Sequence, residues 1–343
     1  MKLLIVTQAV DTEDPVLGFF VGWITELSKH TERIEVICLK EGKHELPQNV
    51  RVHSLGKEHG AAKSATFAWR FLRLAWQLRG NYDAAFVHMN QEYILTAGWL
   101  WKLLGKRVYL WRNHYAGSWL TDVAAAFCTK VFCTSQYSYT VKYAKTVLMP
   151  VGIDTNLFKP EGSRVPHSIL FLARMAPSKH PDILIEALGL LKKKGIVFTA
   201  SFYGLPALGD EQYYTQLKSR TEALELSSEV QFHEAVRNAD TPKIYAAHEI
   251  CVNLSPSGMF DKTIFEAAAA GCLSLTSNKN LEHVVDSRLW YQEGSSTQLT
   301  SKLTQLLQSP EEEKQALRDG LRTLAEENSL AVLWTRLAAE LAV

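Results

Sequence analysis

The sequence lacks the motifs by which several common ligands are bound. No Gly-x-Gly-x-x-Gly follows the first predicted strand, and no Gly-x-x-x-x-Gly-Lys-Ser/Thr occurs, so neither dinucleotide nor P-loop nucleotide binding is indicated. No Asp-x-Asp that could hold a metal ion on a diphosphate follows a predicted strand. The five cysteines include no Cys-x-x-Cys pair and have no Cys or His neighbours at zinc spacing. We therefore expect no metal site and no resident cofactor.

Long hydrophobic runs and an excess of one charge are also missing. The opening run Leu3–Val6 is too short for a secretory signal, and no stretch approaches the roughly 20 apolar residues of a membrane span. With 37 Lys and Arg against 36 Asp and Glu, no overall field attracts nucleic acid. The odd number of cysteines is then most simply explained by reduced thiols in a cytoplasmic protein.

What the sequence does contain is enough apolar material for a core and a regular alternation of elements. Hydrophobic residues make up 47% of its 343 residues, which suits a globular chain of about two domains. In the first half, the predicted strands are Lys2–Thr7, Arg33–Lys40, Val50–Leu55, Ala84–Met89, Arg107–Trp111, Lys130–Thr134 and Thr146–Met149. The helices predicted between them are Phe19–Lys29, Ala68–Arg79, Ile94–Leu104 and Leu120–Phe127. Strands so continuously apolar are typical of a sheet covered on both faces.

The second half repeats this plan. Its predicted strands are Ser168–Leu172, Phe198–Tyr203, Val230–His233, Ile250–Leu254 and Leu273–Thr276. Its predicted helices are Pro181–Lys193, Glu211–Leu224, Thr241–Ala247 and Thr263–Ala270, and three further helices, Gln298–Leu307, Glu311–Glu327 and Ala331–Leu341, end the chain. We therefore expect an α/β protein with two doubly wound parallel sheets. The Gly- and Pro-containing segment Pro150–Pro166 marks the boundary, so the expected domains are residues 1–155 and 156–328.

Ligands of such sheets bind beyond the carboxyl ends of the strands, which selects a few loops. In the first half these loops carry Pro15, Val16, Leu17 and Gly18, then Asn90 and Glu92, then Arg112, Asn113 and His114. In the second half they carry Arg174 and Lys179, then Gly204, then the residues from Ser255 to Thr263. His88 lies in an apolar strand, which favours a core histidine over an acceptor contact.

Arg174 and Lys179 follow one strand and precede a helix. A guanidinium and an ammonium group on one loop suit a diphosphate, but they could equally be solvated surface charges. The segment from Ser255 to Ala267 leads from a buried strand into a helix N-terminus, where anions bind readily. There Thr263 and Glu266 also match a Thr-x-x-Glu capping box, in which Glu266 would satisfy only backbone donors.

Three motifs occur in an order that resembles family 4 retaining glycosyltransferases of the GT-B fold. They are Pro150–Phe158 (PVGIDTNLF), then Arg174 with Lys179, then Ser257–Gly271 with Glu266. The resemblance covers nearly the whole chain. It implies two facing Rossmann-like domains, a nucleotide-sugar donor, no metal, and transfer with retention at the anomeric carbon to a glycan, lipid-linked or small-molecule acceptor. It also implies that the helix within residues 329–343 packs back onto the N-terminal domain.

The resemblance further implies the role of each candidate residue. Arg174 and Lys179 hold the donor diphosphate, Glu266 binds the ribose, and His114 faces the donor sugar. The donor-side loops contribute Gly204, Gly258, Met259, Phe260, Asp261, Lys262 and Thr263. The acceptor side is formed by Pro15, Val16, Leu17, Gly18, Asn90 and Glu92.

The sequence departs from the family at one position. The family commonly has two glutamates separated by seven residues, and Gly258 stands where the first is expected. This loss of a carboxylate keeps open a sugar-nucleotide-binding protein without activity. A non-hydrolysing sugar-nucleotide epimerase, which shares the GT-B architecture, is a third and weaker alternative. Asp261 and Lys262 are the nearby residues that could substitute for the lost carboxylate.

The segment Lys63–Arg79 (KSATFAWRFLRLAWQLR) is both apolar and basic. Phe67, Phe71, Leu74 and Leu78 recur at helical spacing, with arginines among them. It could lie on an anionic membrane at the inner face of the cell, or it could be a helix that covers the domain while its arginines reach the solvent.

Overall fold

The structure is a computed structural model that describes residues 1–14, 16–60 and 63–342. It consists of two compact units: unit 1 contains Met1–Pro150 and Leu330–Val343, and unit 2 contains Val151–Ser329. Unit 2 therefore begins five residues before the expected division after residue 155. The reason is that Val151, Gly152 and Ile153 bond to Asn328 at the other end of unit 2, with Gly152 N and Ile153 N donating to its carbonyl at 3.0 and 3.1 Å.

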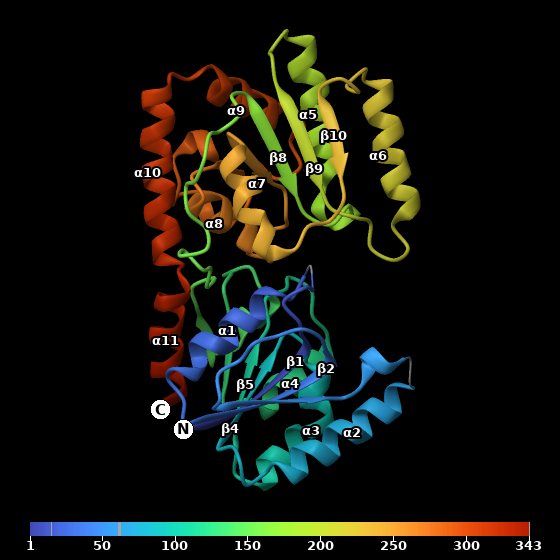
Figure 1. The fold of residues 1–343 in the computed structure, drawn as a ribbon, viewed down its shortest axis with the longest axis vertical. Coiled ribbons are helices and arrows are strands. Elements are labelled where there is room, and N and C mark those ends of the chain that lie inside the picture. The colour runs from blue at the N-terminus through green and yellow to red at the C-terminus, as the bar shows by residue number, and fades with distance from the viewer. Residues whose placement is uncertain (15, 61–62, 343) are drawn as a thin grey trace. The chain divides into compact units, whose positions relative to one another are not determined.

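Unit 1 is built on one parallel sheet of seven strands, in the order β3-β2-β1-β4-β5-β6-β7 (Figure 1). The strands are β1 (Lys2–Val10), β2 (Arg33–Glu41), β3 (Val50–Ser54), β4 (Ala84–His88), β5 (Arg107–Trp111), β6 (Lys130–Cys133) and β7 (Thr146–Leu148). The helices are α1 (Phe19–Ser28), α2 (Ser64–Gln77), α3 (Glu92–Leu103), α4 (Trp119–Phe127) and α11 (Leu330–Ala342). The strands agree closely with the prediction, whereas α2 begins four residues before the expected Ala68.

The two faces of this sheet bury separate cores. One face packs against α1 and α11 through Phe20, Trp23, Leu333 and Trp334. The opposite face packs against α2, α3 and α4 through Phe71, Ile94, Trp101 and Ala124, among others. A central strand such as β1, buried on both faces, therefore reads as a continuous apolar run.

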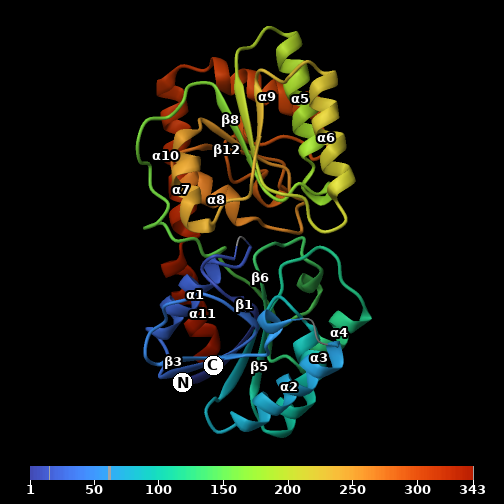
Figure 2. The same cartoon turned by 45° about the vertical axis from the view of Figure 1, so that its right-hand side comes forward.

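Unit 2 contains a smaller parallel sheet of five strands, in the order β10-β9-β8-β11-β12. Figure 2 labels two of its strands, β8 and β12. The strands are β8 (Ser168–Leu172), β9 (Thr199–Tyr203), β10 (Val230–His233), β11 (Ile250–Asn253) and β12 (Leu273–Thr276). The helices are α5 (Pro181–Lys193), α6 (Glu211–Ala223), α7 (Thr241–Ala247), α8 (Lys262–Ala269), α9 (Ser296–Gln308) and α10 (Glu311–Glu327). The expectation of two doubly wound parallel sheets is confirmed.

The last helix, α11, belongs to unit 1 although it follows unit 2 in the chain. The ring centroids of Trp334 and Trp23 on α1 lie 5.5 Å apart in an edge-to-face pair. Lys130 at the start of β6 also donates to the Glu340 carboxylate at 2.9 Å. The structure thus has the arrangement that the resemblance implies for the C-terminal helix.

The cysteines are reduced, and the helices of the described residues are short or polar. All five cysteines are buried as free thiols, and burial raises the pKa of the Cys38 thiol to about 12. Of the helices in the described part of the chain, none is both long and apolar enough to span a membrane.

Candidate functional site

Four neighbouring strands of unit 2 direct their loops to one edge of the sheet. Because β9, β8, β11 and β12 are adjacent and all parallel, the segments after Tyr203, Leu172, Asn253 and Thr276 leave the sheet at the same edge. These segments contain the candidate donor-side residues of the sequence. Polar side chains meet here because the topology brings them together, although they lie up to about 100 residues apart in the chain.

The centre of this edge is a half-buried ion pair between Lys179 and Asp261. Lys179 Nζ lies 2.5 Å from Asp261 Oδ2 and donates to Ser255 Oγ at 2.8 Å. Ser255 Oγ donates to the same carboxylate oxygen, and Asn253 Nδ2 lies 3.4 Å from it. Burial acts to raise the pKa of Asp261, but Lys179 and these hydrogen bonds hold it below its usual range. The candidate cation therefore faces a carboxylate when no ligand is present.

Lys179 is positioned by a short 3₁₀ helix, Pro177–Lys179, between β8 and α5. The next residue, His180, has φ 50°, a left-handed conformation that non-glycine residues adopt uncommonly. Arg174 lies on the same loop but is exposed, and its guanidinium makes no hydrogen bond or ion pair to any described residue. The two cations thus have different environments: Lys179 is held in place by Asp261 and Ser255, and Arg174 projects into solvent.

Gly204 has a structural reason to be glycine. It follows β9 with φ 146°, and an added Cβ would lie 2.0 Å from the carbonyl oxygen of Ala173 in the loop after β8. The Ala173 and Met175 N–H groups donate to the Tyr203 and Leu205 carbonyls, so the two loops stay paired beyond the sheet. Gly204 therefore allows the backbone that carries Arg174 to approach its neighbour closely.

The capping interpretation of Glu266 is wrong. Helix α8 begins at Lys262 with Asp261 at the N-cap, so Thr263 lies inside the helix, where its hydroxyl accepts from Asn253 Nδ2 at 3.0 Å. Glu266 is buried, and its carboxylate accepts from Tyr245 Oη at 3.3 Å and from Asn238 Nδ2 at 3.5 Å. Its partners are thus side chains from α7 and from the loop after β10, and no backbone donor is capped.

Lys262 and Glu266 lie one turn apart on α8 and influence each other electrostatically. Burial raises the pKa of Glu266 and lowers that of Lys262, while the opposite charge of each partner works against both shifts. Lys262 Nζ also donates to the Gly152 carbonyl at 2.5 Å and lies 3.2 Å from that of Val151. The ammonium group therefore anchors the first segment of unit 2. Of the two residues that could replace the missing carboxylate, only Asp261 joins the Lys179 cluster.

The loop between Ser255 and Asp261 is held by contacts within the loop, with the segment after β12 and with α8. Gly258 is buried in a turn closed by Met259 N–H donating to the Pro256 carbonyl at 2.9 Å. Asn278, after β12, donates from Nδ2 to the Met259 carbonyl at 3.2 Å. The Phe260 ring packs edge-to-face on Phe265 of α8, with centroids 4.9 Å apart. The loop is thus a fixed lining, as a preorganised anion site requires.

A hollow of about 470 Å³ borders this cluster. Its lining includes His180, which follows Lys179, and Leu254, which precedes Ser255, together with Ser277 and Trp290. A volume of this size falls within the range of small-molecule sites.

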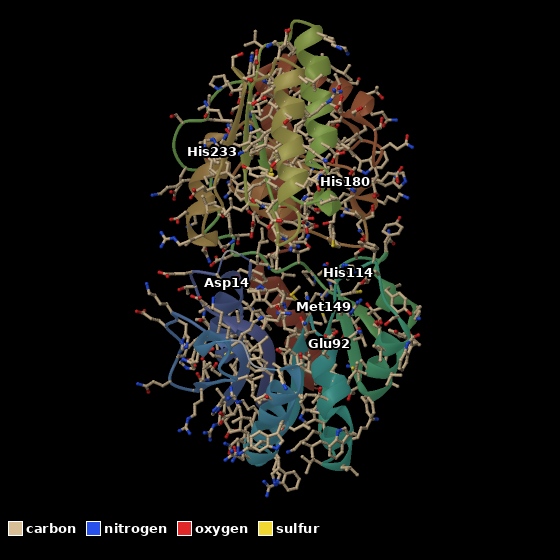
Figure 3. All side chains as sticks on the ribbon, turned by 90° about the vertical axis from the view of Figure 1, so that its right-hand side faces the viewer. Asp14, Glu92, His114, Met149, His180 and His233 are labelled. Atoms are coloured by element: carbon tan, nitrogen blue, oxygen red, sulfur yellow. The ribbon has the colours of Figure 1, made fainter. Side chains whose placement is uncertain are left out.

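Unit 1 has its own hollow, of about 220 Å³, at the carboxyl ends of β4 and β5. The candidates Asn90, Glu92 and His114 all line it, so the structure brings these three predicted residues together. Figure 3 labels Glu92 and His114. The His114 Nδ1 atom accepts the Ala116 N–H at 2.9 Å, the contact of a ring with its proton on Nε2, and the same atom lies 3.3 Å from the Ala116 carbonyl oxygen. The ring also stacks on Tyr115, with centroids 4.6 Å apart. Contacts with Ala116 and Tyr115 therefore orient the His114 ring.

Arg112 lines the same hollow and was not assigned a role from the sequence. Its Nη2 donates to the Ala116 carbonyl at 2.8 Å, while its buried Nη1 has no hydrogen-bond partner within the described residues. Burial lowers the pKa of Arg112, and Glu92 opposes that shift. The signal in the sequence was its position two residues before His114, directly after a buried strand.

The remaining acceptor-side candidates lie on the loop after β1. The Asp14 carboxylate accepts the N–H groups of Val16 and Leu17 at 2.9 Å, and an added Cβ at Gly18 would lie 2.7 Å from the Asp14 carbonyl. Val16 is exposed and Leu17 is buried. Pro15 lies outside the described residues. The loop is thus a compact turn that needs glycine at its end.

His88 has the role in the core that its apolar strand favours. Its ring stacks on Phe20 with centroids 4.0 Å apart, and its Nδ1 lies 3.4 Å from Thr7 Oγ1. Within the described residues, no group of three or more His, Cys, Asp or Glu side chains is arranged to hold a metal ion.

Comparison with known proteins finds sequence similarity over about half of the chain. Residues 154–321 match the family described as glycosyl transferases group 1. Over 169 residues, 47% of this chain, the sequence is 31% identical to a UDP-N-acetylglucosamine–peptide N-acetylglucosaminyltransferase GtfA subunit of Streptococcus parasanguinis. A 147-residue stretch is 30% identical to a mannosylfructose-phosphate synthase of Agrobacterium fabrum. The chain spans about a third of the length of each of these curated relatives.

Solved structures extend the similarity of fold to the whole chain. The Anabaena protein Alr3699/HepE, determined in complex with UDP and glucose, superposes with a TM-score of 0.81 at 18% identity and covers 100% of this chain and 99% of its own. A sucrose-phosphate synthase of Thermosynechococcus elongatus gives 0.82 at 13% identity, covering 100% and 98%. The fold is therefore that of the GT-B glycosyltransferases, with two Rossmann-like parallel sheets.

Proposed function

We propose that this protein is a glycosyltransferase that moves a sugar from a nucleoside-diphosphate sugar to an acceptor hydroxyl, with retention of the anomeric configuration. The observation that carries the proposal is the Lys179 cluster, fixed at the carboxyl edge of a sheet whose residues match glycosyl transferases group 1. The names of the relatives, which include UDP-N-acetylglucosamine, make a UDP-sugar the first donor to test.

In this proposal, unit 2 binds the donor. Negative charge grows on the leaving diphosphate as its bond to the anomeric carbon breaks, and positive groups already in place stabilise that charge without reorganisation. Lys179 and Arg174 supply these groups in place of a metal ion. The N–H groups at the start of α8, near Phe260–Thr263, add the partial positive charge of a helix N-terminus. Glu266 accepts hydrogen bonds from the ribose hydroxyls.

Unit 1 binds the acceptor. His114, with its Nε2 proton, acts on the donor sugar, and Asn90 and Glu92 contact the acceptor hydroxyls together with the loop Val16–Gly18. Support comes from the shared hollow of His114, Asn90 and Glu92. The acceptor class is a glycan, a lipid-linked sugar or a small molecule.

A donor-consumption assay tests this proposal. Lys179→Ala and Arg174→Ala should each lower turnover by about 10²–10³, the usual cost of removing one preorganised donor to a developing negative charge. The double variant should lose less than the product of the two single losses if both groups act on the same phosphates. Lys243→Ala, an exposed lysine on α7 of unit 2, is the matched control and should behave as wild type. Activity in excess EDTA should equal that with magnesium.

The same assay separates the alternatives. A sugar-nucleotide-binding protein without activity, which the loss of the carboxylate at Gly258 favours, would bind the nucleotide without consuming the donor. An epimerase would release free epimerised donor without an acceptor. If Lys179→Ala and Arg174→Ala both keep wild-type turnover and nucleotide affinity, the two cations are surface charges and the proposed donor site is wrong.

A further inference from the structure

Helix α2 has two dissimilar faces. The stripe of Phe67, Phe71, Leu74 and Leu78 packs onto the core of unit 1, and Phe71 is 1% exposed. This stripe, which suggested a membrane contact from the sequence, is therefore not available to a lipid surface. The interpretation of α2 as a helix that covers the domain is right for this face only.

The outer face of α2 carries tryptophan and arginine. Trp69 and Trp76 lie seven residues apart, two helical turns, and are 60% and 49% exposed. Arg73 lies between them, with its guanidinium carbon 5.4 Å from the centroid of the Trp69 ring, and that of Arg79 lies 4.2 Å from the Trp76 ring. Each large apolar ring on this face is thus accompanied by a cation.

The neighbouring helix α3 extends this character. Trp99 and Leu103, one turn apart on α3, are 48% and 78% exposed, and Lys102 beside them is exposed too. The two helices lie side by side on the same face of the unit 1 sheet (Figures 1 and 2). We name Trp69, Arg73, Trp76, Arg79, Trp99 and Leu103 the Trp–Arg surface.

The charge of this region is one-sided. The segment Lys63–Arg79 contains Lys63, Arg70, Arg73 and Arg79 and no acidic residue, although the whole chain is nearly neutral at +1. Arg70, Arg73 and Arg79 are all exposed. Arg70 donates from Nη1 to the Leu55 carbonyl at 2.7 Å, and Arg79 donates from Nη1 to the Trp76 carbonyl at 2.9 Å. A local excess of positive charge on an otherwise balanced protein favours a negatively charged partner.

We propose that the Trp–Arg surface docks unit 1 onto an anionic lipid bilayer. Single exposed apolar residues are ordinary on protein surfaces, but three tryptophans and a leucine with basic side chains on two adjacent helices form a group. Tryptophan rings favour the boundary between headgroups and acyl chains, where the apolar ring is buried and the N–H stays hydrated. Arginine reaches the phosphates from the same depth. The surface therefore combines both parts of an interfacial binding site.

This inference is independent of the proposed function, because it concerns binding and requires no sugar transfer. Flotation of the full chain with vesicles tests it. Binding to vesicles of 30% phosphatidylglycerol in phosphatidylcholine should exceed binding to pure phosphatidylcholine and should weaken as the NaCl concentration rises. Arg73→Gln and Arg79→Gln should each lower the partition coefficient by about fivefold, the contribution of one basic residue near an anionic surface.

Substitution of the aromatic rings tests the other half of the surface. Trp69→Ser with Trp76→Ser should lower binding at least tenfold, since two large apolar side chains leave the interface. Leu208→Ser, at a fully exposed loop leucine of unit 2, and Arg322→Gln, on α10, are the matched controls and should bind as wild type. Circular dichroism checks that each variant is folded.

Equal binding of all variants, or equal binding to both vesicle types, would overturn the proposal. The proposal would also be wrong if the protein bound neither kind of vesicle but sedimented as a dimer, and if Trp69→Ser with Trp76→Ser dissociated that dimer. The partner of the surface would then be a second copy of the chain.

Discussion

At the scale of single residues, the site is defined by a carboxylate that faces one of the two cations proposed to bind phosphate. Asp261 lies 2.5 Å from Lys179, whereas Arg174 is exposed. A donor that approaches Lys179 must compete with Asp261 for the same ammonium group. Asp261 therefore sets the cost of binding a diphosphate there, at a position near the carboxylate lost at Gly258.

Asp261→Asn should raise the affinity for a nucleoside diphosphate by about fivefold to tenfold. The amide keeps a hydrogen-bond acceptor for Lys179 but removes a negative charge beside the incoming phosphates, and a charge interaction near a protein surface is worth about 1 kcal/mol or more. Calorimetric titration with UDP measures the change. Weaker binding by Asp261→Asn would show instead that the carboxylate positions Lys179 or itself contacts the donor sugar. Asp240→Asn, a surface aspartate paired with Arg237, serves as the control.

Glu266→Gln should weaken nucleoside diphosphate binding by about tenfold with a small change in stability. Glutamine can still accept from Tyr245 Oη, but its neutral amide accepts weaker hydrogen bonds from ribose hydroxyls than a carboxylate does. Titration with UDP and a thermal melt check the two expectations. Tyr245→Phe, which removes the hydrogen bond from Tyr245 Oη but leaves the Glu266 carboxylate in place, is the control. Unchanged affinity with a lowered melting temperature would leave Glu266 only its structural role between Tyr245 and Lys262.

The Glu266 environment shows what the sequence could and could not predict at this scale. The position of Glu266 in the motif singled it out, but the spacing Thr-x-x-Glu equally indicated a cap. That choice depended on where α8 begins, and the chain turns into the helix one residue earlier than expected, at Lys262. The true partners, Tyr245 and Asn238, lie more than 20 residues away along the chain, so no local pattern could indicate them.

At the scale of elements, the strands were predictable and the faces of the helices were not. Continuous apolar runs identify strands buried on both faces, as in Leu3–Val6 of β1 and Ile169–Leu172 of β8, because no polar side chain interrupts these runs. For α2 the apolar stripe was recognised, but Trp69 and Trp76 on the opposite face are also apolar. Periodicity alone cannot tell which of two apolar faces meets the core. The boundary between the units was predicted after residue 155, but the structure has it after Pro150. Asn328, at the far end of unit 2, bonds to Val151, Gly152 and Ile153 and so includes them in unit 2.

Contacts between elements also predict how the stability of unit 2 depends on pH. His248, at the end of α7, has Nδ1 2.7 Å from the Ile244 carbonyl and Nε2 3.1 Å from Ser201 Oγ on β9. Burial lowers the pKa of His248 below 6.5, and the backbone hydrogen bond opposes this. The unfolded chain therefore binds more protons than the folded one just below pH 6.5, so stability should fall as the pH drops from about 6.5 toward the lowered pKa.

His248→Gln should reduce the dependence of the stability of unit 2 on pH. Urea unfolding at intervals from pH 7.5 to 5, with the free energy of unfolding plotted against pH, should show a smaller loss on acidification for the variant than for wild type. His30→Gln, which changes an exposed histidine of unit 1, should keep the wild-type slope. If wild type and His248→Gln fall in parallel, His248 is protonated equally in the folded and unfolded states, and the contact does not couple α7 to pH.

At the scale of the whole molecule, the chain ends in the unit where it began. Helix α11 follows unit 2 but contributes Leu333, Trp334, Leu337 and Leu341 to the core of unit 1. The folding of unit 1 therefore needs residues separated by more than 180 positions along the chain, which is a costly loop to close. The amphipathic pattern of α11 was visible in the sequence. Its destination was implied only by the resemblance, because a pattern of apolar residues does not say which sheet they cover.

Trp334→Ala should destabilise unit 1 selectively. Trp334 is 2% exposed and pairs edge-to-face with Trp23, and truncation of a buried aromatic side chain typically costs about 3–5 kcal/mol. Hydrogen exchange of the full chain should then show faster exchange in peptides from β1, α1 and α11, while peptides from β8 and β11 keep wild-type protection. Leu303→Ala, at a fully buried position of α9, is the reciprocal control and should loosen unit 2 alone. Equal loss of protection in both units from Trp334→Ala would mean that they unfold as one cooperative body and that α11 stabilises the entire chain.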